Sequence, residues 1–214
     1  MEDARAYMKG TAPAAEGLFK LLNQYGWKKL RALVALTETK TRLEPEARKE
    51  TFSSTDIARE IVAGSILQIA YVAIASYAKP AGKSTNALHF ESEINRLIRE
   101  NPDLKPRKDK FELPVKFCVG RDIGYLPLGV IVYAGRNQYN HFYKDKRLSV
   151  VNELVFNHLH AMWPKPKNGL SFDLRPGKLF SYSVLAALGW TDTSRGLGYD
   201  AYKRDMADVL QIEL

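Results

Sequence analysis

The sequence predicts an all-α, or nearly all-α, helical bundle. One observation is the spacing of apolar residues, which recur every three or four positions in most segments between Pro13 and Leu210. Another is the run from Ile61 to Ala78, which has no charged residue and suits a central helix covered by its neighbours. Several prolines and glycines fall between the apolar segments, where helices begin and end.

The N-terminal region predicts two helices followed by a linker. Residues 13–25 begin with a proline, which is well tolerated in a first helical turn, and they end before Gly26, a common helix stop. A second helix is expected over 27–36, with leucines and a valine on one side and basic residues on the other. Residues 37–52 are polar and charged, so we expect a linker there, or a short helix around 45–50.

Two more helices and an extended segment are expected in the middle of the chain. Ser53 or Ser54 is a suitable N-cap for a long helix that reaches residue 78, where a Lys-Pro pair ends it. Residues 86–100 have the pattern of an amphipathic helix. Residues 111–119 alternate enough to predict an extended segment or a short strand.

The next predicted helix, over 127–143, begins with Pro127 and is apolar nearly all round in its next two turns, so it is expected to be buried. Ser149 is expected to cap a helix that runs to about Met162.

A proline- and lysine-rich break at residue 164 divides the predicted bundle. We therefore expect residues 1–163 to form one helical domain. Residues 164–214 are expected to form a C-terminal helical extension packed on it, with helices over 179–188 and 199–210.

The composition favours an anionic partner and argues against metals and disulfides. Lys and Arg number 32 against 24 Asp and Glu, a net charge of +8 that favours nucleic acid or another polyanion. Cys118 is the single cysteine, which excludes an internal disulfide framework and a cysteine zinc site. The four histidines lack ligand spacing, so we expect no metal and no other cofactor. With no apolar leader, and with residues 61–78 interpreted as a core helix, we expect a cytoplasmic protein outside the membrane.

A polar cluster follows the apolar part of the helix predicted over 127–143. Arg136, Asn137, Asn140 and His141 come at its far end, with Tyr143 just beyond. A guanidinium carries a permanent charge and a fork of donors that matches phosphate, and an imidazole moves protons near neutral pH. This pair of side chains indicates phosphodiester chemistry.

The order Arg136, four residues, His141, one residue, Tyr143 resembles the Arg-x4-His-x-Tyr form of the HEPN superfamily, whose Arg-x4-6-His signature occurs in helical ribonucleases and toxins. The resemblance implies a metal-independent endoribonuclease of the toxin or anti-phage defence type. Arg136 and His141 would be its catalytic residues and Asn137 a supporting polar residue. Tyr143 would be a modification site that receives adenylate from an antitoxin partner. The resemblance also implies a homodimer in which two copies of the motif face each other.

The helical spacing of the motif raises a geometric question. Asn137 and His141 are four positions apart and share a helix face, whereas Arg136 and His141 are five apart and diverge by about 140°. Arg136 must curl its side chain around, or the helix must loosen near Gly135, or a second subunit must complete the pair.

Basic residues on both sides of the motif helix are candidate RNA contacts. They are Lys144, Lys146 and Arg147 after the motif, and Lys108 and Lys110 in the basic turn before it.

Three other interpretations remain open, and one of them is a membrane-associated helical protein, because residues 61–78 carry no charge. The same fold can serve as a non-catalytic HEPN-like module that binds RNA, a nucleotide or a protein partner. Alternatively, Arg136 pairs with a carboxylate and His141 bonds the last carbonyls of its own helix, so that both residues are structural.

Overall fold

The chain folds as an all-α protein, which confirms the predicted fold class. A computed structural model describes residues 2–37, 45–79, 83–100, 114–141, 149–164, 172, 178–191 and 197–213. Its helices are α1 (Glu2–Thr37), α2 (Pro45–Tyr77), α3 (Thr85–Glu100), α5 (Leu128–His141), α6 (Val150–Met162), α7 (Ser181–Ala187) and α8 (Leu197–Leu210). Strands β1 (Asp122–Ile123) and β2 (Leu126–Pro127) form a small antiparallel ribbon.

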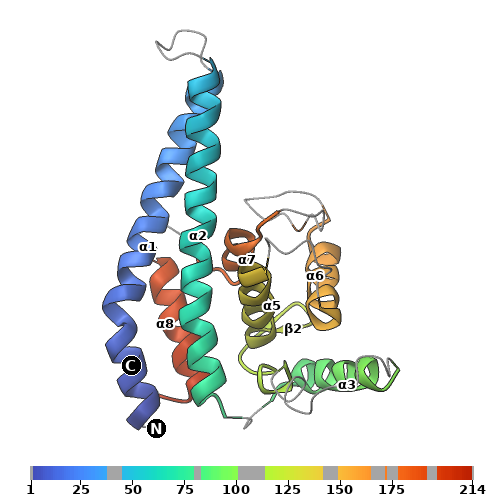
Figure 1. Cartoon of the computed structure of the whole chain (residues 1–214). Coiled ribbons are helices and arrows are strands. Elements are labelled where there is room, and N and C mark those ends of the chain that lie inside the picture. The colour runs from blue at the N-terminus through green and yellow to red at the C-terminus, as the bar shows by residue number, and fades with distance from the viewer. Residues whose placement is uncertain are drawn as a thin grey trace.

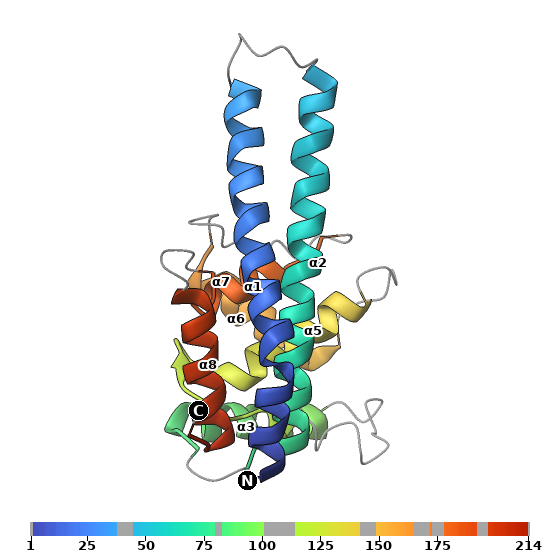
Figure 2. The same ribbon diagram turned by 90° about the vertical axis from the view of Figure 1, so that its left-hand side faces the viewer.

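The helices α1 and α2 form a long hairpin that organises the molecule (Figure 1). One half of the hairpin packs against the other helices, with α8 along α1 and α2, and with α5 and α7 beside α2. The other half projects beyond the rest of the protein, as Figure 2 shows from a second direction. Helix α6 packs on α5, and α3 lies at the end of the molecule away from the projecting tip.

A single helix, α1, spans the region where two were predicted, so the predicted break at Gly26 is wrong. Gly26 is tolerated inside the helix because α1 packs along α2, and these contacts outweigh the intrinsic helix penalty of about 1 kcal/mol. Pro13 also lies within α1 rather than in its first turn. Pro13 and Lys9 are both exposed, so water can reach the Lys9 carbonyl that proline leaves without its helical donor.

Helix α2 begins at Pro45, so the prediction that it starts at Ser53 or Ser54 is wrong. For residues 45–50 the predicted helix is confirmed and the alternative linker is wrong, because these residues form the first turns of α2. Pro45 occupies the first helical position, where its missing N–H is not needed. The Ser54 hydroxyl donates to the Thr51 carbonyl at 3.2 Å. It thus bonds back to the preceding turn instead of capping a new helix.

The extended segment predicted over 111–119 is also wrong where the structure describes it. Residues 114–116 form a helical turn, in which the Phe117 N–H donates to the Pro114 carbonyl at 3.1 Å. The strands come later, where Asp122 pairs with Pro127. Residues 111–113 lie outside the described part of the chain.

The other helix predictions agree with the structure to within a few residues. Ser149 caps α6 as expected, its side chain accepting from the Asn152 N–H at 3.4 Å. The segment after residue 164 supplies much of the core, because Val184, Leu185, Trp190 and Met206 are fully buried.

One helical segment of the described chain, Lys49–Tyr77 within α2, is long and apolar enough to span a membrane by length and composition, and its 18-residue apolar window has a mean hydropathy of 1.5. One such helix is weak evidence for a membrane span, because the core helix of a soluble protein passes the same test. Its side chains Ala63, Leu67, Ala70 and Ile74 have no exposed surface, which agrees with the predicted core helix.

Candidate functional site

Helix α5 is held between α2 and α7, and this fixes the place of its polar end. Its residues from Leu128 to Ile131 are buried, as the apolar sequence predicted. Gly135 lets α5 approach both neighbours, since a Cβ there would lie 2.8 Å from Cγ1 of Val184 and 3.1 Å from Cδ1 of Leu67. The next residue, Arg136, is half-buried beside α2.

The Arg136 guanidinium is held by amide oxygens from two helices. Its Nε donates to Oε1 of Gln68 on α2 at 2.9 Å, and its Nη1 donates to Oδ1 of Asn137 at 3.1 Å. With the Asn140 amide oriented to satisfy both its ends, the Asn140 oxygen accepts from Nε at 3.0 Å and from Nη2 at 3.1 Å. These four residues form what we call the Arg136 cluster.

Aromatic rings complete the surroundings of Arg136. The guanidinium carbon lies 4.3 Å from the centre of the Tyr71 ring, a cation–π contact. Tyr133 lies beside Tyr71, with ring centres 6.2 Å apart, and burial raises the pKa of Tyr133. Because the Tyr71 ring carries no charge at neutral pH, it orients the guanidinium without neutralising it.

The charge of Arg136 has no carboxylate partner among the described residues. Its hydrogen bonds go to the neutral amides of Gln68, Asn137 and Asn140. The structural alternative, in which Arg136 pairs with a carboxylate, therefore finds no support in the part of the chain that the structure describes. A fixed cation with neutral neighbours is suited to an external anion.

The structure keeps His141 on the same helix as the Arg136 cluster. His141 is the last residue of α5 and its side chain is exposed. Helix α5 is continuous from Leu128 to His141, so the helix does not loosen near Gly135. Arg136 turns toward Gln68 instead. In the continuous helix, the five-residue spacing puts Arg136 and His141 on faces about 140° apart.

Several predicted site residues lie outside the described part of the chain. They are Tyr143, Lys144, Lys146 and Arg147 after the motif, and Lys108 and Lys110 before it.

Two further contacts fix the end of α5. The Tyr139 ring packs directly on Gly64 of α2, so close that an added Cβ would lie 2.3 Å from Cδ2 of the ring. Gln138 is buried, and its Oε1 accepts from the Phe180 N–H at 3.2 Å at the start of α7. Gln138 and Tyr139, the two residues between Asn137 and Asn140, are thus anchored to neighbouring elements, which preorganises the Arg136 cluster.

A buried carboxyl group lies on α2, two turns before Gln68. Burial raises the pKa of Glu60 to about 7, although the Tyr182 N–H donates to its Oε2 at 3.0 Å. Arg59 and Lys29 act in the opposite direction and favour the charged form. Glu60 therefore changes its protonation state near neutral pH.

Sequence reasoning found Arg136, Asn137 and Asn140 but not their partners on α2. Gln68 is the single side-chain amide in the uncharged run from Ile61 to Ala78, and an isolated amide in a buried helix needs a partner. Nothing in the sequence indicated which residue would supply that partner. Tyr71 and Glu60 gave no signal beyond their place on the same helix.

Within the described residues, no group of three or more His, Cys, Asp or Glu side chains is placed to hold a metal ion. Comparisons with protein-family models, with curated proteins and with solved structures found no match to this chain. The resemblance to the HEPN superfamily thus rests on the motif residues and stays a prediction.

Proposed function

We propose that this protein is a metal-independent endoribonuclease of the toxin or anti-phage defence type, acting in the cytoplasm on RNA. The observation that carries the proposal is the Arg136 cluster, which holds a guanidinium by neutral amides on the helix that ends at His141. A charge with no counterion among the described residues gains from binding an external anion, and phosphate matches the guanidinium fork.

The cluster leaves donors for such an anion. The single N–H of Nε is shared between Gln68 and Asn140, Nη1 and Nη2 each donate once within the cluster, and a guanidinium has five N–H groups. One N–H on each terminal nitrogen therefore has no acceptor assigned among the described residues. Two N–H groups on one planar group can meet two oxygens of the same phosphate.

In the proposed reaction the 2′-hydroxyl of the RNA attacks the adjacent phosphorus. A base removes the hydroxyl proton, the new P–O2′ bond forms, the P–O5′ bond breaks, and an acid protonates the leaving 5′ oxygen. His141 is assigned one of these proton transfers, and Arg136 stabilises the charge on the phosphorane oxygens. Asn137, which shares a helix face with His141, orients the imidazole or a phosphate oxygen. The products are a 2′,3′-cyclic phosphate and a 5′-hydroxyl, and DNA is not cut because it lacks the nucleophile.

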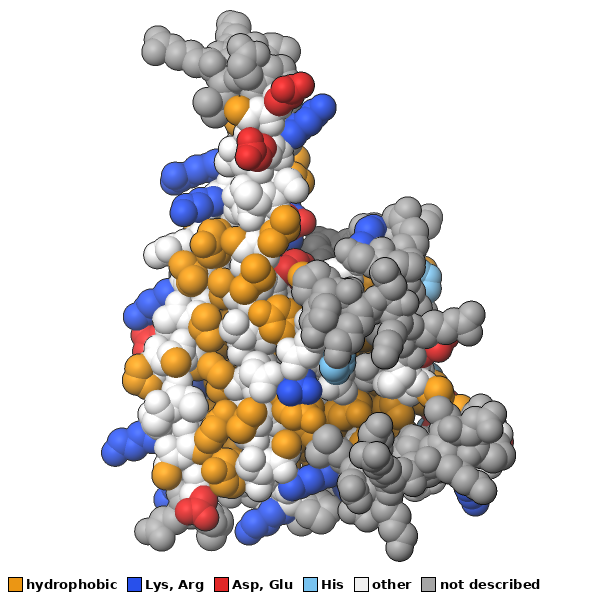
Figure 3. Space-filling model, in the orientation of Figure 1, with side chains coloured by type: hydrophobic (Ala, Val, Ile, Leu, Met, Phe, Trp, Pro, Cys, Tyr) orange, Lys and Arg blue, Asp and Glu red, His pale blue; other side chains and the backbone are white. Residues whose placement is uncertain are grey.

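A homodimer would let His141 of one subunit act with Arg136 of the other. Support comes from α2, where Ile57 and Ile61 are 57% and 47% exposed and lie on the same helix face as Gln68. Figure 3 shows hydrophobic side chains gathered along this side of the hairpin. Pairing two copies through this face would bury the isoleucines and bring the two Arg136 clusters toward each other.

The remaining roles depend on residues beyond the described part of the chain. We assign Lys144, Lys146, Arg147, Lys108 and Lys110 to phosphates that flank the cleaved bond. Tyr143 is assigned as a modification site, through which an antitoxin or other regulatory partner would silence the enzyme.

The test is incubation of purified protein with total RNA in excess EDTA, followed by analysis of the product ends. Wild-type protein should leave 2′,3′-cyclic phosphates, and Arg136→Ala and His141→Ala should each lower the rate at least a hundredfold. Lys20→Ala is a matched control on the exposed surface of α1. Intact RNA with wild-type protein, or cleavage that His141→Ala retains, would overturn the proposal.

A second candidate is a non-catalytic module that binds RNA, a nucleotide or a protein through the same Arg136 cluster. The observation that favours it is the separation of the motif side chains, because Arg136 turns toward α2 while His141 is exposed at the helix end. This module would bind RNA and lose binding in Arg136→Ala, but His141→Ala would leave the affinity unchanged and no RNA would be cut.

A further inference from the structure

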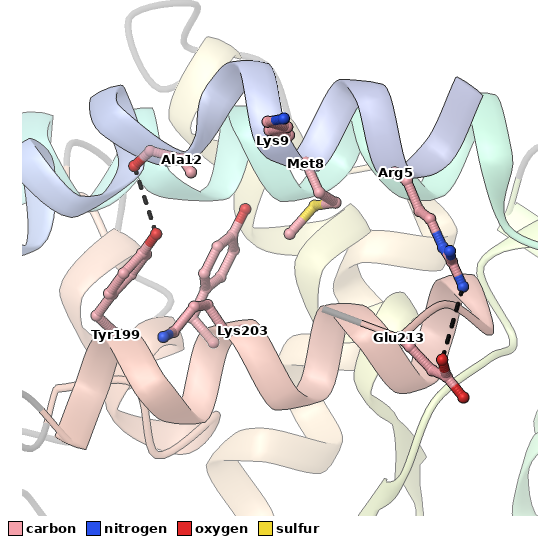
Figure 4. Close-up of a pocket in the computed structure, with 8 residues that line it drawn as sticks. Arg5, Met8, Lys9, Ala12, Tyr199, Lys203 and Glu213 are labelled. Atoms are coloured by element: carbon pink, nitrogen blue, oxygen red, sulfur yellow. Dashed lines mark hydrogen bonds and ion pairs between the residues drawn. The ribbon is translucent and has the colours of Figure 1, made fainter. Parts of the chain in front are cut away.

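A second site lies between α1 and α8, formed by none of the residues of the Arg136 cluster. It is a pocket of about 340 Å³, within the size range of small-molecule sites. Figure 4 shows side chains from both helices facing each other across it. The lining residues are Arg5, Met8, Lys9, Ala12, Tyr199, Tyr202, Lys203 and Glu213.

The pocket extends along α1 and α8, which run in opposite directions. At one end the Tyr199 hydroxyl donates to the Ala12 carbonyl at 3.4 Å, and at the other end Arg5 lies 3.9 Å from Glu213 (Figure 4). The stretch of α1 from Arg5 to Ala12 covers two turns, about 10 Å. Met8, Ala12 and the two tyrosine rings give this length an apolar lining, which suits a short hydrocarbon chain.

The charged residues of the pocket are mostly cations. The lining contains three cations, Arg5, Lys9 and Lys203, and one carboxylate, Glu213. The Glu213 side chain is fully exposed and 3.9 Å from Arg5, so water screens this pair and its contribution is small. Lys203 also contacts Asp200 at 3.0 Å, outside the lining. The pocket therefore favours a ligand with a negative charge.

An unpaired hydroxyl group gives an independent indication of a ligand. Tyr202 is 1% exposed, and its hydroxyl has no hydrogen-bond partner among the described residues. A buried hydroxyl without a partner is unfavourable, so most such groups in proteins are paired. Burial raises the pKa of Tyr202, so the group keeps its proton and remains a donor at neutral pH. The Tyr202 hydroxyl therefore lacks a hydrogen-bond acceptor.

We propose that this pocket binds an amphipathic organic anion, of the class of medium-chain acyl carboxylates. The carboxylate accepts a hydrogen bond from the Tyr202 hydroxyl and is paired with the pocket cations, chiefly Lys9 and Arg5. The acyl chain lies against Met8, Ala12 and Tyr199. This binding goes beyond the proposed nuclease function and does not depend on it.

Isothermal titration with decanoate below its micelle concentration tests the proposal on the full chain. Decanoate should bind saturably, with one molecule per chain, and decanol should bind at least tenfold more weakly because it lacks the charge. Tyr202→Phe and Lys9→Ala should each weaken decanoate binding about tenfold. Lys20→Ala, which changes a lysine on the same helix outside the pocket, should bind as the wild type does.

The stability of the variants separates loss of the ligand site from loss of the fold. Without ligand, Tyr202→Phe should melt at or above the wild-type temperature, because it removes an unpaired buried polar group. Ala12→Phe fills the pocket from the α1 side and should abolish binding by a second route. Equal affinity for decanol and decanoate, equal weakening in Lys20→Ala, or no saturable binding to the wild type would overturn the proposal. So would binding of a mononucleotide in place of decanoate.

Discussion

Gln68 on α2 accepts a hydrogen bond from Nε of Arg136 on α5 at 2.9 Å. This contact joins the longest uncharged stretch of the sequence to the polar end of the motif helix. Because Gln68 is neutral, it orients the guanidinium and leaves its charge available. The contact therefore offers a way to separate a structural role of Arg136 from a role in binding phosphate.

Gln68→Glu should keep the protein folded but weaken RNA binding and cleavage. The glutamate keeps an acceptor for Nε of Arg136, and its charge adds an ion pair, so the melting temperature should stay within a few degrees of the wild type. The new carboxylate competes with phosphate for the guanidinium, and we expect RNA cleavage to fall about tenfold or more. Gln68→Met is the matched control that removes the acceptor without adding charge. Undiminished cleavage in Gln68→Glu would mean that Arg136 does not contact the substrate.

Gly64→Ala should destabilise the protein although alanine is the better helix former. The new Cβ would lie 2.3 Å from Cδ2 of Tyr139, so the ring must move away from α2. We expect the free energy of unfolding to fall by about 1–3 kcal/mol, because the steric cost exceeds the stabilisation from the higher helix propensity of alanine. Denaturant titrations of Gly64→Ala, Tyr139→Ala and the double variant measure this coupling. Strict additivity of the two changes would contradict the close contact.

The sequence was sufficient for the fold class but not for the length of the hairpin. The three- and four-residue spacing of apolar side chains identified α2, α3, α5 and α6 because each buries one face against its neighbours. Gly26 and Ser54 were predicted as helix boundaries, but both lie inside a continuous helix. The pairing of α1 with α2 along their length outweighs these local signals, and such pairing between distant segments is not visible in a local pattern.

The candidate site was predictable only on the helix that carries the motif. Arg136, Asn137 and Asn140 are close in sequence, so helical spacing was enough to group them. Their contacts with Gln68 and Tyr71 depend on how α5 crosses α2, which is decided by the close approach at Gly135. That approach is a property of packing between helices, and the sequence pattern of either helix alone does not contain it.

Asp205→Ala should destabilise the junction between α7 and α8. Asp205 accepts from Nε of Arg121 at 2.7 Å and from Nε1 of Trp190 at 2.7 Å. The Trp190 side chain is fully buried, so its N–H would lose its acceptor in a place that water does not reach. We expect the free energy of unfolding to fall by about 2–3 kcal/mol, and the melting temperature by about 4–10 °C.

Arg121→Ala is the control for this change. It removes the partly exposed guanidinium that pairs with Asp205 and leaves the hydrogen bond from Trp190 to Asp205 in place. It should have the smaller effect on the melting temperature. An equal effect of the two substitutions would show that the Trp190 hydrogen bond contributes little.

Glu60→Gln should stabilise the protein at high pH and not at low pH. The pKa of Glu60 rises from 4.5 to about 7 on folding because the carboxyl group is buried. Between these two values the folded protein retains a proton that the unfolded chain releases, so the wild type loses stability as the pH rises from 4.5 to 7. Above pH 7 the loss is complete and amounts to about 3 kcal/mol as an order of magnitude.

Glutamine carries no charge at any pH, and its side-chain oxygen can still accept the hydrogen bond from the Tyr182 N–H. Urea titrations at pH 4.5 and pH 8 should therefore show similar stability for the two proteins at the lower pH and a more stable variant at the higher pH. Glu16→Gln is the control, because the hydrogen bond from Lys20 lowers the pKa of that exposed carboxyl and the substitution should bring no gain at high pH. A difference between Glu60→Gln and wild type that does not change with pH would show that Glu60 is already charged at pH 4.5 in the folded protein, and hence that burial does not control its titration.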